Sequence, residues 1–153
     1  RRAKGYGLRG DVLANPLPLS VSVAHGAGAM RSTAADMLRW QDALFSGKVV
    51  KPESLALMIE PSKLKDGRLT SAVRKPDPSG RAPLEYGLGL AVGERDGRRV
   101  IGHGGAINGF NSALYTYPDD RTSIVLLVNT EGGANQRYDD VAEAWFGGNG
   151  AKK

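Results

Sequence analysis

The chain has 153 residues, enough for one domain of ordinary size, and its composition, 41% hydrophobic and 24% charged, excludes wholesale disorder. It lacks cysteine, which excludes disulfides, thiolate zinc sites and cysteine nucleophiles, and no apolar run reaches the roughly 18 residues of a membrane-spanning helix. The net charge is +5, and the excess of basic residues lies in a loop-like segment, residues 62–85, and at the two ends of the chain. These basic segments lack the stacking aromatic side chains of nucleic-acid binders, so we expect no nucleic-acid partner.

Residues 1–31 are rich in Gly, Pro and Ala and predict an irregular lead-in. A helix is expected to follow, because Ser32 or Thr33 can cap its first turn and Asp36 stands three residues after Thr33, as in a capping box. The apolar residues beyond Asp36 recur at helical spacing, and Gly47 is the natural end of this helix.

A second, short helix is expected to begin at Pro52, which the first turn of a helix tolerates, and to end before Pro61. After the basic loop the pattern changes to a strand period, because apolar residues alternate with small ones over residues 86–93. Asp96-Gly97 is a strong hairpin signal and predicts a turn there, followed by a second, antiparallel strand.

This second strand is expected over about residues 98–104, and the remaining predicted elements are two strands and a helix, over about residues 111–117, 122–129 and 136–146. The unbroken apolar run at residues 124–128 is typical of a central strand covered on both faces. The sequence therefore predicts an α+β fold, in which an antiparallel meander of about four strands is flanked by helices.

The segment most informative about function is the glycine-rich stretch over residues 102–110, in which His103 stands between Gly102 and Gly104. Four glycines within eight residues at the end of a strand do not favour stability, and each lets a backbone or a ligand approach closely. Exposed N–H groups on such a strand can pair with an extended substrate or hold a developing oxyanion, with His103 as donor or proton carrier beside them. A glycine-rich turn with a histidine packed beside it fits the same pattern equally well.

Other candidate residues carry weaker signals. Ser62 and Lys65 satisfy the pattern Ser-x-x-Lys, but they lie in a polar loop rather than at the start of a buried helix, which favours a chance match. His25 precedes the first predicted helix in a loop of small residues and is expected to be structural. Ser112 could join His103 in a triad, although it lies on a strand without the context of a nucleophile elbow. Two histidines without a nearby carboxylate pattern predict no zinc site.

Several short segments stand in a recognisable order along the chain: residues 26–36 (GAGAMRSTAAD), 86–90 (YGLGL), 102–105 (GHGG), 109–112 (GFNS), 117–120 (YPDD) and 128–129 (VN). In this order and spacing they resemble the C-terminal part of the β-lactamase-related serine hydrolases, which include class C β-lactamases, D-alanyl-D-alanine peptidases and related esterases. The resemblance covers about residues 5 to 147, nearly the whole chain. It implies part of a β-lactamase/transpeptidase-like fold.

The resemblance also implies a mechanism. In the family, a serine in a Ser-x-x-Lys motif attacks an amide or ester carbonyl, a Tyr-x-Asn or Ser-x-Asn motif shuttles protons, and a Lys-Thr-Gly or His-x-Gly strand lines the opposite wall. His103-Gly104-Gly105 matches this third motif, with His in place of the commoner Lys. This match implies a catalytic role for His103 and substrate binding by Gly104, Gly105 and Ala106, with the Ala106 N–H as an oxyanion donor. No cofactor and no metal are implied.

The chain departs from the family pattern at the other two motifs. It contains no Tyr-x-Asn or Ser-x-Asn, and Ser62 begins its one Ser-x-x-Lys match. We therefore expect residues 1–153 to be a single C-terminal part of such a hydrolase domain, which does not hydrolyse β-lactams or esters alone. Its expected partners are the missing N-terminal part of the same protein or further copies of itself, and the intact protein would take a small amide or ester substrate.

Two other readings remain open. In one, the chain is a non-catalytic module that holds a small acyl or peptidoglycan-like ligand in the glycine-lined groove. In the other, it is a structural or interaction domain in which the groove is vestigial. A periplasmic or secreted location follows from the resemblance alone.

Overall fold

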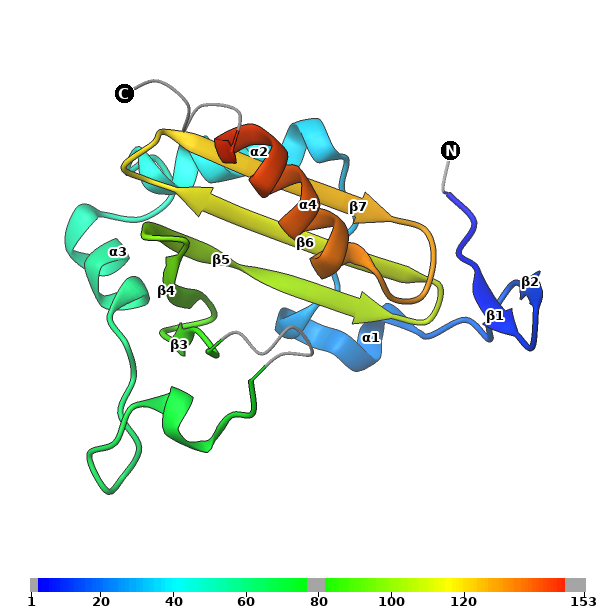
Figure 1. The fold of residues 1–153 in the computed structure, drawn as a ribbon, viewed down its shortest axis with the longest axis horizontal. Helices are drawn as coiled ribbons and strands as arrows, with labels where there is room; N and C mark the ends of the chain where they lie inside the picture. Colours follow the sequence, from blue (N-terminus) through cyan, green and yellow to red (C-terminus); the bar gives the residue numbers. More distant parts are fainter. Residues whose placement is uncertain (1–2, 77–81, 148–153) are drawn as a thin grey trace. The chain divides into compact units, whose positions relative to one another are not determined.

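The computed structural model describes residues 3–76 and 82–147 (Figure 1). The chain divides into two compact units, one formed by residues 1–38, 104–114 and 124–153 and the other by residues 39–103 and 115–123. Part of the basic loop that the sequence predicts, residues 77–81, lies outside the described residues, as do the basic residues at the extreme ends of the chain.

The main sheet has five strands in the spatial order β3-β4-β5-β6-β7. In chain order they are β3 (Glu85–Tyr86), β4 (Ala91–Arg95), β5 (Arg98–Ile107), β6 (Phe110–Tyr117) and β7 (Thr122–Val128). The helices are α1 (Val21–Ala24), α2 (Ala34–Phe45), α3 (Pro52–Ile59) and α4 (Ala134–Gly147). Helices combined with an antiparallel meander confirm the predicted α+β class.

Two local signals of the sequence, the cap of α2 and the turn between β4 and β5, are confirmed. The Thr33 hydroxyl accepts the N–H of Asp36 at 3.1 Å and donates to its carboxylate at 2.9 Å, so Thr33 caps α2. At the β4–β5 hairpin, Asp96 and Gly97 have φ angles of 52° and 73°, the positive values that a two-residue hairpin turn of this type requires.

The strand expected over residues 86–93 is interrupted, which is why the sheet has one strand more than the four predicted. The chain leaves β3 after Tyr86 and turns, with the N–H of Gly87 donating to the Leu90 carbonyl at 2.8 Å and Gly89 at a φ of 78°. The alternating glycines imitate the period of a strand, although here they serve a turn.

Regular structure also occurs where the sequence suggests an irregular lead-in. Residues 7–14 form a two-stranded hairpin, β1 (Gly7–Arg9) with β2 (Val12–Ala14), followed by α1 and a 3₁₀ turn at His25–Ala27. The hairpin turns at Gly10, whose φ is 61°. The side chain of Ser20 accepts the N–H of Ser22 at 3.4 Å and caps α1.

The prediction of a central strand at residues 124–128 is wrong. This run belongs to β7, which stands at the end of the strand order, and Leu127 remains 47% exposed. The most deeply buried large side chains are instead Val100 and Ile101 on β5, at 0% and 1% exposure. Burial on two faces therefore follows the position of a strand in the sheet rather than the length of its apolar run.

Each unit has its own buried centre. In the unit of residues 39–103 and 115–123, Val100 and Ile101 are buried, and Gln41 of α2 donates to the Thr116 hydroxyl at 2.9 Å, so that a buried polar side chain has a partner. In the other unit, Ala113 and Ala134 are fully buried, at 0% exposure. No helix within the described part of the chain is long and apolar enough to cross a membrane.

A glycine allows a close backbone approach at Gly87, directly after β3. A Cβ placed there would lie 2.2 Å from the carbonyl oxygen of Met58 and 3.1 Å from that of Glu60, both near the end of α3. The Met58 carbonyl also accepts the N–H of Leu88 at 2.9 Å. A side chain at position 87 would therefore force β3 away from α3.

We expect Gly87→Ala to lower the free energy of unfolding by about 2 kcal/mol or more, since the new methyl group overlaps backbone atoms that cannot rotate away. Urea denaturation measures this loss. Gly26→Ala is the matched control, because a Cβ at Gly26 meets nothing within 4 Å. Equal midpoints for the two variants would contradict the close approach at Gly87.

Candidate active site

The four residues that the sequence singles out are consecutive on β5. Strand β4 pairs with β5 from Arg98, opposite Arg95, to Gly102, opposite Ala91, so this ladder ends one residue before His103. The boundary between the two units falls between His103 and Gly104.

His103 pairs with a tyrosine that the sequence analysis did not assign to the site. The hydroxyl oxygen of Tyr86 lies 2.8 Å from Nε2 of His103, and the two rings meet edge to face, with centroids 5.6 Å apart and planes at 74°. The side chain of His103 is exposed and that of Tyr86 is half-buried. In the register of the sheet Tyr86 is opposite Ala91, and Ala91 is opposite Gly102, the residue before His103.

Hydrogen bonds hold the backbone of Tyr86 on both sides. Its N–H donates to the Thr70 hydroxyl at 3.0 Å, and its carbonyl accepts the N–H of Ser62 at 2.8 Å. The preceding carboxylate, Glu85, accepts the Thr70 hydroxyl at 3.1 Å and the N–H of Ser71 at 3.0 Å. The loop that carries Thr70 and Ser71 is thereby bound to β3.

The charge of Glu85 strengthens this connection. Burial acts to raise the pKa of the Glu85 carboxyl, but the hydrogen bonds from Ser71 and Thr70 outweigh it and lower the pKa below its usual range. The carboxylate is therefore ionised at neutral pH, and hydrogen bonds to a charged acceptor are stronger than neutral ones. Tyr86 lies directly next to this anchored residue.

Gly105 and Ser112 contact each other on neighbouring strands. A Cβ at Gly105 would lie 2.7 Å from the hydroxyl oxygen of Ser112, so the serine side chain occupies the space that a larger residue would need. Ser112 is half-buried on β6. This contact explains why residue 105 is a glycine and gives Ser112 a packing role.

Ala106 lines a cavity of about 260 Å³ in the unit of residues 1–38, 104–114 and 124–153. Glu131 contributes a carboxylate to the lining, with Oε2 3.8 Å from Nη1 of Arg9, and Asn111 contributes an amide whose Oδ1 accepts the N–H of Ala134 at the start of α4. A carboxylate and an amide therefore line the cavity beside the Ala106 backbone.

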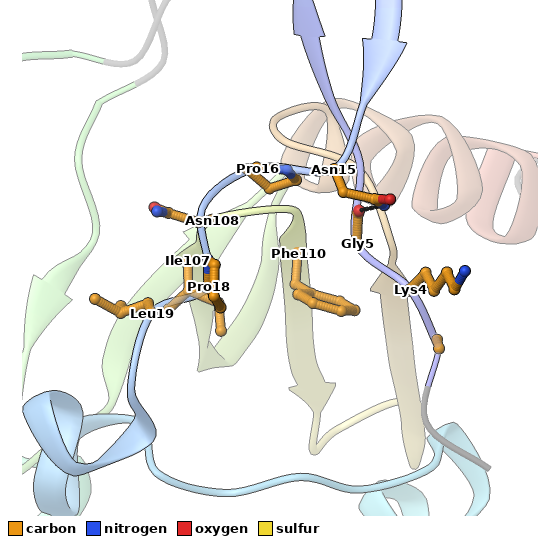
Figure 2. Close-up of a pocket in the computed structure, with 10 residues that line it drawn as sticks. Lys4, Gly5, Asn15, Pro16, Pro18, Leu19, Ile107, Asn108 and Phe110 are labelled. Atoms are coloured by element: carbon orange, nitrogen blue, oxygen red, sulfur yellow. Dashed lines mark hydrogen bonds between the residues drawn. The ribbon is translucent and has the colours of Figure 1, made fainter.

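A second cavity, of about 330 Å³, lies in the same unit, where the lead-in passes over the turn between β5 and β6 (Figure 2). Its apolar lining includes Phe110 and Ile107, and the side-chain amide of Asn15 donates to the Gly5 carbonyl at 2.7 Å across its edge. The Asn108 amide reaches the Leu17 carbonyl at 3.0 Å and ties the turn to the lead-in.

The weaker candidates lie in other surroundings. Ser62 and Lys65 follow α3 in a loop, with Lys63 bridged to Leu69, so this Ser-x-x-Lys match does not open a helix. His25 is exposed at the start of a 3₁₀ turn, with a φ of 43°. Among residues 3–76 and 82–147 there is no group of three or more His, Asp or Glu side chains placed to hold a metal ion.

Comparison with known proteins identifies the family. A family model described as beta-lactamase matches residues 1–146. A D-aminopeptidase of Brucella anthropi is 28% identical over 131 residues, which are 85% of this chain and 22% of that protein. The chain therefore spans about a fifth of the length of this curated relative.

Solved structures of similar fold are also hydrolases by their descriptions. A D-stereospecific amidohydrolase from Streptomyces sp. matches 93% of this chain and 38% of its own, with a TM-score of 0.69 and 26% identity. A D-amino acid amidase from Ochrobactrum anthropi SV3 matches 97% of this chain and 43% of its own, with a TM-score of 0.74 and 23% identity. These two structures share the fold of the chain, and the family match shows that the chain belongs to the beta-lactamase family of serine hydrolases, whose C-terminal part it resembles.

Proposed function

We propose that residues 103–106 of β5 form one wall of an acyl-transfer site for amides, with amides or short peptides of D-amino acids as the substrate class. The observation that carries the proposal is the sequence His103-Gly104-Gly105-Ala106 on a strand whose ladder with β4 ends at Gly102. The substrate class is supported by the relatives, which are described as a D-aminopeptidase, a D-amino acid amidase and a D-stereospecific amidohydrolase.

In this proposal the backbone of β5 makes most of the contacts with the substrate. The N–H of Ala106 donates to the carbonyl oxygen of the substrate as it gains negative charge, and one such donor contributes about a hundredfold to a thousandfold in rate. The glycines at 104 and 105 let an extended substrate approach the strand without meeting a side chain. His103 provides a hydrogen-bond donor or proton carrier beside the reacting group.

The nucleophile would come from outside this chain. The attacking serine of the family stands in a Ser-x-x-Lys motif at the start of a helix, whereas the match at Ser62 lies in a loop and donates its N–H to Tyr86. Loss of the nucleophile alone removes most of the rate enhancement of a serine hydrolase. The same strand without a nucleophile would bind a small acyl or peptidoglycan-like ligand, and this is the second candidate function.

We also propose that the chain associates with a further segment of its protein or with other copies of itself. Val141 and Trp145 lie one helical turn apart on α4 and are 41% and 57% exposed. Large apolar side chains exposed on one helix face favour a covering partner. The small share of the D-aminopeptidase that the chain spans, 22%, is consistent with such a partner.

The chain alone is expected to show no turnover of a chromogenic cephalosporin or of a D-amino acid p-nitroanilide. It is also expected not to be labelled by a fluorophosphonate, since no serine stands in the required Ser-x-x-Lys context. Absorbance and intact-mass measurements test this, with a complete D-amino acid amidase as the positive control. Turnover, or covalent labelling at any serine, would refute the proposal that the chain supplies one wall of the site and no nucleophile.

Sedimentation equilibrium is expected to give a mass above the 16.2 kDa of one chain, rising with concentration. Val141→Lys should lower that mass, because it places a charge on the exposed apolar face of α4. Glu143→Lys is the control, since position 143 lies on the opposite side of the helix. A monomer at all concentrations would show that this face needs no second copy.

A further inference from the structure

We propose that Tyr86 is a positioning residue that holds the imidazole of His103 in one tautomer, with the proton on Nδ1 and the lone pair of Nε2 accepting the Tyr86 hydroxyl. The inference rests on the proposed function of β5 and deepens it, because it states which ring nitrogen of His103 carries the proton. Family membership does not assign this role to Tyr86, which belongs to no Tyr-x-Asn motif.

The donor and the acceptor follow from the chemistry of the two groups. At 2.8 Å the hydroxyl oxygen of Tyr86 and Nε2 of His103 are within hydrogen-bond distance. A phenol is a good O–H donor, and the unprotonated nitrogen of a neutral imidazole is a good acceptor. The reverse bond, from an imidazole N–H to a phenol oxygen, uses the weaker partner in each role. The pair therefore favours the Nδ1–H tautomer.

The contact between the rings restricts the orientation of the imidazole as well as its proton. The ring centroids are 5.6 Å apart at an angle of 74°, which is the edge-to-face arrangement that aromatic rings prefer. Rotation of the His103 side chain to another rotamer would lose this contact together with the hydrogen bond. Both interactions thus stabilise the same ring position.

The position of the phenol is itself fixed by the backbone of β3. The N–H and the carbonyl of Tyr86 are bonded to Thr70 and Ser62, and the next residue, Gly87, lies against the Met58 carbonyl. In the register Tyr86 lies two strands away from Gly102, and its hydroxyl is 2.8 Å from Nε2 of His103. A hydroxyl held from both sides of its own backbone is a preorganised partner rather than a chance surface contact.

The consequence concerns what His103 can do. In water the Nε2–H tautomer of histidine predominates, and the tautomer of a histidine in a protein is set by the hydrogen bond at its other nitrogen. With Nε2 occupied by Tyr86, the one proton that the neutral ring can donate is on Nδ1.

The test is a long-range ¹H–¹⁵N correlation spectrum of the labelled chain, which reads the protonation of each ring nitrogen directly. The chain has two histidines, so His25 serves as an internal reference. The pH is raised until both rings are neutral. We expect His103 to be mainly the Nδ1–H form, and Tyr86→Phe to shift its tautomer ratio toward Nε2–H by about twofold to tenfold, the effect of losing one ordinary hydrogen bond.

Tyr6→Phe is the matched control, because it removes a phenolic hydroxyl from a half-buried tyrosine in the other unit. It should leave the tautomer ratio of His103 unchanged. A predominantly Nε2–H ring in the unmodified chain would overturn the proposal, as would an unchanged ratio in Tyr86→Phe. If Tyr86→Phe does not fold, the tautomer of the unmodified chain alone decides.

The outcome is separate from that of the proposed function. The tautomer is measured without substrate, so an Nε2–H ring would contradict the role of Tyr86 without contradicting substrate binding by β5. Failure of β5 to bind an amide would contradict the proposed function without changing the measured tautomer of His103.

Discussion

The chain passes so close to α3 at Gly87 that a Cβ there would lie 2.2 Å from the Met58 carbonyl oxygen. This close approach and the hydrogen bonds from Tyr86 to Thr70 and Ser62 hold the short strand β3 in a fixed position. Strand β3 pairs with β4 at Tyr86 and Ala91, and β4 pairs with β5 at Ala91 and Gly102, so β3 is connected to β5 through β4. The orientation of the His103 ring depends on this backbone constraint.

The arrangement assigns different tasks to side chains and backbone. Glu85, Tyr86 and the loop around Thr70 position one imidazole, whereas in the proposed function Gly105 and Ala106 offer backbone groups to an approaching substrate. Gly105 also accommodates the Ser112 hydroxyl, so its lack of a side chain serves packing as well as access. In the proposed function, the N–H of Ala106 stabilises the oxyanion that develops on the substrate.

Local features of the fold could be predicted from the sequence, and features set by distant contacts could not. The Thr33 cap and the Asp96-Gly97 turn depend on a few neighbouring residues, and both were predicted correctly. The continuous strand predicted over residues 86–93 is interrupted, because alternating glycines imitate the period of a strand. The central strand predicted at residues 124–128 is wrong, because the exposure of Leu127 depends on the position of β7 at the end of the sheet. The segments that resemble the family led to the correct family, but they do not reveal that Tyr86 meets His103, since the two side chains come from strands that are not neighbours in the sheet.

The central claim is that β5 binds an amide substrate along residues 104–106. Backbone ¹H–¹⁵N shifts of the chain, followed during titration with D-phenylalanine amide, test it most directly. The account predicts saturable shifts at Gly104, Gly105 and Ala106, with no comparable shifts around the cavity that Phe110 lines. Saturable shifts confined to that other cavity, or none at Gly104 to Ala106 at the highest soluble ligand concentration, would contradict it.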